Sequence, residues 1–279
     1  WSIIRQSNIL CAVVSLSYTI FALGFTTNHN IMFIIKGIEA FGNYCSLMWN
    51  SFGKPEKWKE FFRRYLNEIS KLGIDSIPLI LIVSLFIGCL CTILIKLNME
   101  NPLLPRYTVG FSTREIILLE FSSSILCLIL SGKIGSNIAS EIGTMRVTEQ
   151  IDALDIMGVN SANHLIMPKV LGLVTIMPFL VVITMVTALF GGWAVCFTGI
   201  LDPDTYIYGI QTDFVQFNVW FALIKSLVFG FIISSISAYY GYTVKGGSVE
   251  VGKASTDAVV MSNIIILISD VILTKLLLV

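Results

Sequence analysis

The sequence predicts an all-α membrane protein, in which an amphipathic interfacial N-terminal helix precedes five transmembrane helices and a short cytoplasmic helix joins the second to the third. Two observations on composition support this class. Of the 279 residues, 55% are hydrophobic and only 13% are charged, whereas soluble domains carry about 25% charged residues. The mean hydropathy is +0.83. The third observation is five apolar stretches, each near the roughly 20 residues that a helix needs to cross a bilayer.

Residues 1–31 are interpreted as an upstream or poorly assigned apolar segment. Residues 9–25 form an apolar run after Arg5, about the size of a signal-peptide core. The sequence opens on Trp1 and its first methionine is Met32. We favour upstream sequence, with the functional chain beginning near Met32, over the alternative of a signal anchor or an additional span.

Residues 32–75 form an N-terminal region whose second part, KPEKWKEFFRRYLNEISKL over 54–72, predicts an amphipathic helix. Apolar side chains from Trp58 to Leu72 recur at three- and four-residue steps, and charged side chains from Lys57 to Lys71 fill the opposite face. An aromatic face with a basic back is typical of a helix lying in the membrane interface. A soluble amphipathic helix is the less favoured alternative, because no soluble core is available to cover it.

Five spans over 76–279 form the main domain, and we place them at about 76–97, 114–135, 165–197, 214–240 and 256–278. The third is long enough to tilt or kink, and Pro168 and Pro178 offer places to do so. Lys and Arg are concentrated before the first span and in the two loops on that same side. The positive-inside rule therefore predicts a cytoplasmic N-terminus and an external C-terminus.

The composition also argues against several kinds of site. Lys plus Arg and Asp plus Glu both number 18, so no basic excess favours nucleic acid. Most of the six cysteines lie in apolar runs, and the only histidines are His29 and His164. We interpret the cysteines as small hydrophobic residues rather than as metal ligands or disulfides.

Residues 244–256, VKGGSVEVGKAST, come close to a nucleotide-binding P-loop. Gly247, Gly252 and Lys253 have the required spacing, but Ala254 stands where a Ser or Thr must hold Mg²⁺. A P-loop also needs a preceding strand and a soluble α/β domain. We therefore predict a tight cytoplasmic turn between the fourth and fifth spans, and no cofactor bound by this chain.

The connection between the second and third spans predicts a short helix from Thr144 to Met157. Gly143 is expected to break the preceding helix, and Gly158 to supply a left-handed C-terminal cap. One side carries an apolar stripe and the other is acidic; the side chains concerned are Val147, Ile151 and Leu154, and Glu149, Asp152 and Asp155. Such a helix suits insertion into a groove on a soluble partner. A solvated helix without a partner remains an equal alternative from the residues alone.

The run EIGTMRVTEQIDALDIMGV, Glu141 to Val159, resembles the signature of MlaE-type permeases of Gram-negative bacteria, the membrane subunits of ABC transporters that work with MCE-domain lipid-binding proteins. The resemblance continues upstream in SGKIGSNIAS and returns in ALIKS (Ala222–Ser226) and VEVGKASTDAVV (Val249–Val260). It covers most of residues 54–279. The chain departs from the pattern over residues 119–123, where LEFSS replaces the R-E-L-G-P of many relatives. Glu120 is kept, but the arginine and the Gly-Pro kink are not.

The resemblance implies a non-catalytic, homodimeric permease subunit in the bacterial inner membrane. It would move phospholipid or a related lipid between that membrane and a periplasmic MCE-domain carrier. ATP and Mg²⁺ would bind a separate ABC ATPase subunit, and a small cytoplasmic accessory subunit is a further partner that the resemblance allows. The short helix at about 144–157 would be the coupling helix, seated on the ATPase. Carried over by motif, the ATPase-coupling residues are Glu141, Thr144, Arg146, Glu149, Gln150, Asp152 and Leu154.

Three charged residues, Glu120, Lys225 and Asp270, fall inside the apolar spans. A charge at the centre of a bilayer costs about 2.5–3.5 kcal/mol on insertion scales, so such groups tend to face a cavity or each other. We predict that Lys225 pairs with Glu120 or Asp270. The three residues are either a substrate-pathway site that receives lipid headgroups or a structural salt bridge, and the residues leave both readings open.

The same three residues would also suit a proton-coupled secondary transporter, which is the alternative function. That class commonly shows internal repeats and paired broken helices, and we find neither in the sequence. An intramembrane enzyme is the least favoured class, because it would need a nucleophile with a base or a metal-binding motif such as H-E-x-x-H.

Overall fold

The computed structural model describes residues 39–53, 58–99 and 105–278, and within these ranges it contains helices and no strand. The predicted segment 1–31 lies outside the described residues. The chain divides between Asn50 and Ser51 into two compact units. In the first, residues 39–50 are helical. The second contains the predicted spans.

The second unit consists of helices joined by short turns. The first two spans contain α2 (Trp58–Glu68), η1 (Ile69–Gly73), η2 (Ile74–Ser76), α3 (Ile77–Asn98), α4 (Thr108–Ile116), η3 (Ile117–Ile125), α5 (Leu126–Leu130), η4 (Ser131–Gly135) and α6 (Ser136–Val147). The rest contains α7 (Gln150–Ile156), α8 (Ser161–Val195), η5 (Cys196–Ile200), α9 (Pro203–Gln211), α10 (Phe217–Tyr242) and α11 (Ser248–Leu278).

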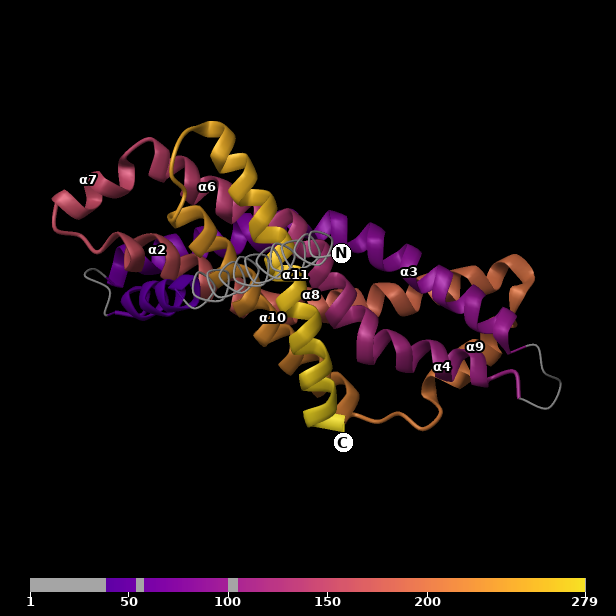
Figure 1. Ribbon diagram of the computed structural model, residues 1–279. Helices are drawn as coiled ribbons and strands as arrows, with labels where there is room; N and C mark the ends of the chain where they lie inside the picture. Colours follow the sequence, from indigo (N-terminus) through magenta and orange to yellow (C-terminus); the bar gives the residue numbers. More distant parts are fainter. Residues whose placement is uncertain (1–38, 54–57, 100–104, 279) are drawn as a thin grey trace, which may run out of the picture. The chain divides into compact units, whose positions relative to one another are not determined.

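Five helical segments are long and apolar enough to cross a membrane: Trp58–Asn98, Thr108–Val147, Ser161–Gly199, Phe217–Tyr242 and Ser248–Leu277. They confirm the five predicted spans and the predicted class of all-α membrane protein. Figure 1 shows α2 and α7 at one end of this unit, and α4 and α9 at the other. We call these the α7 end and the α9 end.

The predicted amphipathic helix is present and continues into the first span. Helix α2 passes through the π-helical η1 and the 3₁₀-helical η2 directly into α3. It has no buried residue, and Trp58 and Phe62 on its aromatic face are exposed. An aromatic face that the protein leaves uncovered suits the membrane interface better than a soluble core.

The second span departs from the regular α-helical hydrogen-bond pattern although residues 119–123, LEFSS, contain neither Gly nor Pro. Two π-helical segments interrupt it, η3 with Glu120 and η4 with Lys133. Each π-turn adds a residue to the turn and occurs frequently at functional sites. The second span therefore departs from regular α-helix next to the predicted substrate-pathway site.

One predicted boundary is wrong, because the short helix begins at Gln150 instead of Thr144. Gly143 stays inside α6, where it faces Val251, and a Cβ added to it would lie 3.1 Å from that side chain. The helix breaks instead at Glu149, whose φ is 60°. The cap at Gly158 is confirmed, with a φ of 81°.

The fifth span also begins earlier than predicted, at Ser248 instead of about Thr256. Gly246 has a φ of 122° and lies in the turn, whereas Gly252 and Lys253 lie inside α11. Two of the residues that suggested a P-loop are therefore helical. The predicted turn is real but is confined to the residues before Ser248.

Helix α8 covers most of the third predicted span, whose last two residues lie in η5, and it contains both Pro168 and Pro178 within one continuous helix. It begins at Ser161, four residues before the predicted start, because Asn160 caps it: the Asn160 side-chain oxygen accepts a hydrogen bond from the Asn163 main-chain N–H at 3.1 Å.

Helices α3 and α8 cross closely at two glycines. A Cβ on Gly88 would lie 1.8 Å from the carbonyl oxygen of Ala188, and one on Gly191 would lie 2.3 Å from that of Leu85. Both obstacles are main-chain atoms, which cannot turn aside as a side chain can. The contact therefore requires glycine on both helices.

We expect Gly88→Val to force the two helices apart and to destabilise the protein by about 1–3 kcal/mol or more, the usual cost of overpacking. Thermal unfolding of the purified protein in detergent measures the effect. Gly132→Ala is the matched control, because nothing lies within 4 Å of its added Cβ. Equal melting temperatures for the two variants would contradict this reading of the crossing.

Candidate functional site

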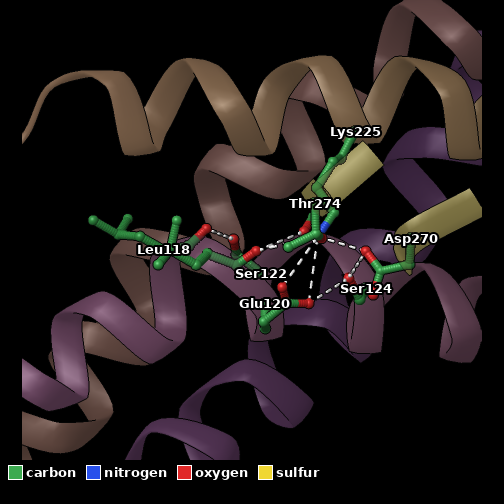
Figure 2. Close-up of polar contacts among 9 residues, drawn as sticks. Leu118, Glu120, Ser122, Ser124, Lys225, Asp270 and Thr274 are labelled. Atoms are coloured by element: carbon green, nitrogen blue, oxygen red, sulfur yellow. Dashed lines mark hydrogen bonds and ion pairs between the residues drawn. The ribbon is translucent and has the colours of Figure 1, made fainter. Parts of the chain in front are cut away.

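The three charged residues predicted to lie within the spans meet at one point. Glu120 comes from η3, Lys225 from α10 and Asp270 from α11. The Lys225 ammonium lies 2.5 Å from Asp270 Oδ1 and 3.3 Å from both carboxylate oxygens of Glu120, as Figure 2 shows. The predicted pairing of Lys225 is thus confirmed, and with both carboxylates rather than one. We call these residues the intramembrane cluster.

Two hydroxyl groups complete the intramembrane cluster. Ser124 Oγ lies 3.1 Å from Glu120 Oε2 and 2.8 Å from Asp270 Oδ1, so it bridges the carboxylates, and Thr274 Oγ1 lies 3.2 Å from the Lys225 ammonium (Figure 2). Sequence reasoning missed both residues. A signal for them was present, because each lies four positions after a carboxylate, at a spacing that brings side chains together on a helix.

The members of the cluster differ in how much they are exposed. The Lys225 side chain is 0% exposed and Glu120 is 40% exposed, whereas Asp270 is 16% exposed. The Lys225 ammonium also lies 4.7 Å from the centre of the Phe221 ring, a favourable cation–π position. Glu120 is therefore the member that a molecule outside the chain reaches most easily. Lys225 is buried between the two carboxylates and contacts both.

The charges of the cluster do not cancel when all three groups are ionised, since two carboxylates face one ammonium. Such an arrangement has spare acceptor capacity for a donor or cation on a substrate headgroup. Within the described ranges, no group of three or more His, Cys, Asp or Glu side chains is arranged to hold a metal ion. The cluster can hold charge and bind polar groups.

Helix α7 turns its apolar stripe inward and its acidic side outward. Ile151 is buried and Leu154 is half-buried, whereas Glu149 and Asp152 are exposed. Arg146 binds Asp152 Oδ1 at 2.7 Å and so ties the end of α6 to α7. The other end of α7 presents Ile156 and Met157, which are 86% and 68% exposed. This acidic surface with an apolar tip is available to a soluble partner.

The remaining predicted coupling residues have contacts inside the chain. Thr144 lies on α6, and its hydroxyl donates to the carbonyl of Ser140 at 2.7 Å. The Gln150 amide donates to Thr148 Oγ1 at 3.0 Å. Glu141 faces the protein, where its Oε2 lies 2.7 Å from the Lys71 ammonium and 3.0 Å from that of Lys169. A coupling role for these residues stays a prediction.

A second polar centre, at the α9 end, was not predicted. Arg114 of α4 is fully buried, and its guanidinium donates to the main-chain carbonyls of Ile210 and Thr212 at 2.7 Å and of Asp213 at 3.1 Å. It also binds Glu115 Oε1 at 2.6 Å. Arg114 thereby fixes the segment that follows α9, a helix that the sequence did not reveal.

Glu115 extends this centre to the start of α10. Its second carboxylate oxygen accepts a hydrogen bond from the Asn218 amide at 2.5 Å. Asn218 and Lys225 lie seven residues apart in α10, two helical turns, and so point to the same side. The second span, through its consecutive parts α4 and η3, is therefore joined to α10 at two places: by Glu115–Asn218 and by Glu120–Lys225.

The five spans define a polytopic membrane protein. It has a short helix with an exposed acidic side between the second and third spans, and charged residues gathered inside the spans. The family model for the MlaE permease matches residues 65–276. The chain belongs to the MlaE permease family.

The names of similar proteins agree with membership of a permease family. The chain is 34% identical over 224 residues to a probable ABC transporter permease protein of Rickettsia bellii, a match that covers 77% of this chain and 83% of the relative. It is 31% identical over 215 residues to a probable ABC transporter permease protein of Synechocystis, covering 77% and 81%. It is 32% identical over 233 residues to the chloroplast protein TRIGALACTOSYLDIACYLGLYCEROL 1 of Arabidopsis thaliana, covering 78% and 63%.

Proposed function

We propose that this ABC transporter permease moves phospholipid or a related lipid, driven by ATP hydrolysis on a separate ATPase subunit. The intramembrane cluster carries the proposal. It places a half-exposed carboxylate, Glu120, against a buried Lys225 within otherwise apolar spans, which suits a molecule with a charged headgroup and apolar chains. The Arabidopsis relative is named after a glycolipid, trigalactosyldiacylglycerol, and this name also supports a lipid substrate.

The ATPase partner is proposed to sit on α7. Its acidic side and its exposed apolar tip at Ile156 and Met157 resemble a helix that inserts into a groove. ATP and Mg²⁺ would bind the ATPase, so this chain would be a non-catalytic subunit. The α7 end would then be cytoplasmic, as the distribution of Lys and Arg predicts, and the α9 end would face the periplasm across the bacterial inner membrane.

Further partners follow from the size of the domain. Five spans are few to enclose a lipid with two chains, so two copies around a central cavity are the economical arrangement. Helix α11 supports this, because only 11% of its most apolar window is buried within the chain. At the α9 end we propose an MCE-domain carrier that exchanges lipid with the permease. A small cytoplasmic accessory subunit is a further proposed partner.

The experiment that tests the proposal is lipid transfer by the reconstituted complex. Proteoliposomes containing the permease and its ATPase should transfer labelled phospholipid to or from a soluble MCE-domain acceptor. A catalytically inactive ATPase should abolish transfer, and a proton ionophore should leave it unchanged. The opposite pattern, transfer that survives the inactive ATPase and stops with the ionophore, would instead establish a proton-coupled transporter.

We expect Glu149→Lys to weaken the association with the ATPase by about tenfold, which corresponds to about 1.4 kcal/mol. Glu149 is exposed at the start of α7, so reversing its charge should disturb an interface and not the fold. Asp152→Lys should act in the same direction, although it also breaks the Arg146 ion pair. Co-purification and titration of the ATPase measure the effect.

The matched control is Asp204→Lys, an exposed charge reversal on α9. It should leave ATPase binding unchanged, because α9 lies at the opposite end. Equal binding by the Glu149→Lys variant and the unsubstituted protein would remove α7 from the interface, and loss of binding in the Asp204→Lys variant would reverse the predicted orientation.

A further inference from the structure

Four charged side chains at the α7 end form a cluster that is separate from the intramembrane cluster. Lys169 of α8 lies 2.7 Å from Glu68 Oε1 of α2 and 3.0 Å from Glu141 Oε2 of α6. Lys71 of η1 lies 2.7 Å from the same oxygen of Glu141. We call these residues the ion-pair quartet. It joins the proposed interfacial helix, the helix that leads to α7, and the third span.

Lys169 limits how these three elements can move. Its side chain is only 3% exposed, and removing the partner of such a buried charge is strongly destabilising. A movement that left Lys169 without a carboxylate would therefore be strongly opposed. It has two carboxylates, however, so it keeps one whichever of the two helices shifts.

Glu141 has the same redundancy. One oxygen, Oε2, serves both Lys71 and Lys169. If α6 moves away from η1, Glu141 loses Lys71 but keeps Lys169, and no carboxylate is left unpaired. Lys71, whose side chain is 46% exposed, is the member that is most easily released.

Glu68 offers Lys71 a second partner. Its Oε2 is buried and accepts no hydrogen bond from any described residue, so one acceptor position of the quartet is unused. Lys71 follows Glu68 by three residues, and the negative charge of Glu68 already interacts with the Lys71 ammonium. The π-helical η1, Ile69–Gly73, contains Lys71, and π-helical turns within helices occur frequently at functional sites.

The quartet is connected to α7 through a single helix. Glu141 lies in α6, which ends at Val147 and is followed after Thr148 and Glu149 by α7. Arg146 binds Asp152 across this junction at 2.7 Å. This connection is the route by which a displacement of α7 would reach Glu141.

We infer that the quartet is an exchange switch, in which Lys71 alternates between Glu141 and Glu68 as α6 moves with α7. The exchange keeps the number of ion pairs constant, so α6 can separate from the α2–η1 segment without an unpaired buried charge. Lys71 is then a positioning residue that links the coupling helix to the interfacial helix. This inference rests on the proposed function, because it takes the displacing force from an ATPase seated on α7.

The first test is Lys71→Met in the full complex of permease and ATPase, reconstituted in phospholipid vesicles. Lipid transferred per ATP hydrolysed should fall about fivefold or more, the lower range of a coupling between sites. Lys71→Arg keeps the charge and should restore the ratio. Lys59→Met removes an exposed lysine from α2 and is the matched control, expected to have no effect. An unchanged ratio in Lys71→Met overturns the switch.

The second test measures the movement without altering the quartet. Spin labels on cysteines introduced at Arg63 of α2 and at the half-buried Asn137 of α6, with Cys11, Cys45 and Cys89 replaced by serine, report the distance between these two helices. Trapping the ATPase in its ATP-bound state should shift this distance, and an identical distribution with and without nucleotide overturns the switch even if Lys71→Met fails to fold. Lipid transfer at the same rate with the active and the inactive ATPase would instead overturn the proposed function.

Discussion

The Lys225→Met variant should lose lipid transfer and melt at a lower temperature than the unsubstituted protein. Without the ammonium, Glu120 and Asp270 remain on either side of Ser124 with no counterion. Asp270 is only 16% exposed, and leaving a largely buried charge without its partner costs about 3–5 kcal/mol. A transfer rate reduced by about tenfold or more would reflect about 1.4 kcal/mol of lost stabilisation in the transport step. Thermal unfolding in detergent and transfer in vesicles measure the two effects separately.

A neutral triple variant separates the two roles of the intramembrane cluster. Glu120→Gln, Lys225→Met and Asp270→Asn together leave no charge to compensate, and neutral replacement of a buried ion pair is often tolerated or even stabilising. We therefore expect its melting temperature to recover while transfer stays lost. If transfer recovers as well, the cluster is a structural salt bridge and its assignment to the substrate pathway is wrong.

The Arg114→Met variant should be destabilised by a similar amount, about 3–5 kcal/mol, because it too removes a buried charge from its partners. The carbonyls of Ile210, Thr212 and Asp213 would lose their donor, and Glu115 would lose its ion pair. We expect limited proteolysis to cut between α9 and α10 in the variant but not in the unsubstituted protein. Thermal unfolding gives the magnitude.

Two further substitutions test whether the guanidinium itself is required. Arg114→Lys keeps the charge but not the planar fork of donors. Its melting temperature should therefore lie between those of the Arg114→Met variant and the unsubstituted protein. Arg106→Met removes an exposed arginine nearby, and surface changes of this kind are usually within about 0.5 kcal/mol of the parent. If Arg114→Met behaves like Arg106→Met, Arg114 does not hold the segment after α9.

Features that depend on a continuous stretch of chain were predictable. The five spans followed from apolar length, and the cap at Gly158 from its position after a short helix. The pairing of Lys225 was also predictable, although its partners lie far away in the sequence, because few charges enter the spans and an unpaired one is costly there.

Features that depend on packing were not predictable in the same way. Gly143 was expected to end a helix, but it lies within α6, packed so closely against Val251 that an added Cβ would lie 3.1 Å from that side chain. Glu141 was assigned to an external partner, yet Lys71 and Lys169 bind it inside the chain. The neighbouring sequence of a glycine is the same whether it ends a helix or packs within one. That of a glutamate is the same whether it binds an external partner or a lysine of its own chain.

Arg114 marks this boundary most clearly. Arg114 stands at the start of the predicted second span, and the residues around it in the sequence do not indicate a partner inside the protein. Its acceptors are main-chain carbonyls nearly a hundred positions later. Every residue has such a carbonyl, so no side-chain pattern announces the contact. Only the folded chain, which leaves these carbonyls buried and in need of donors, gives Arg114 its role.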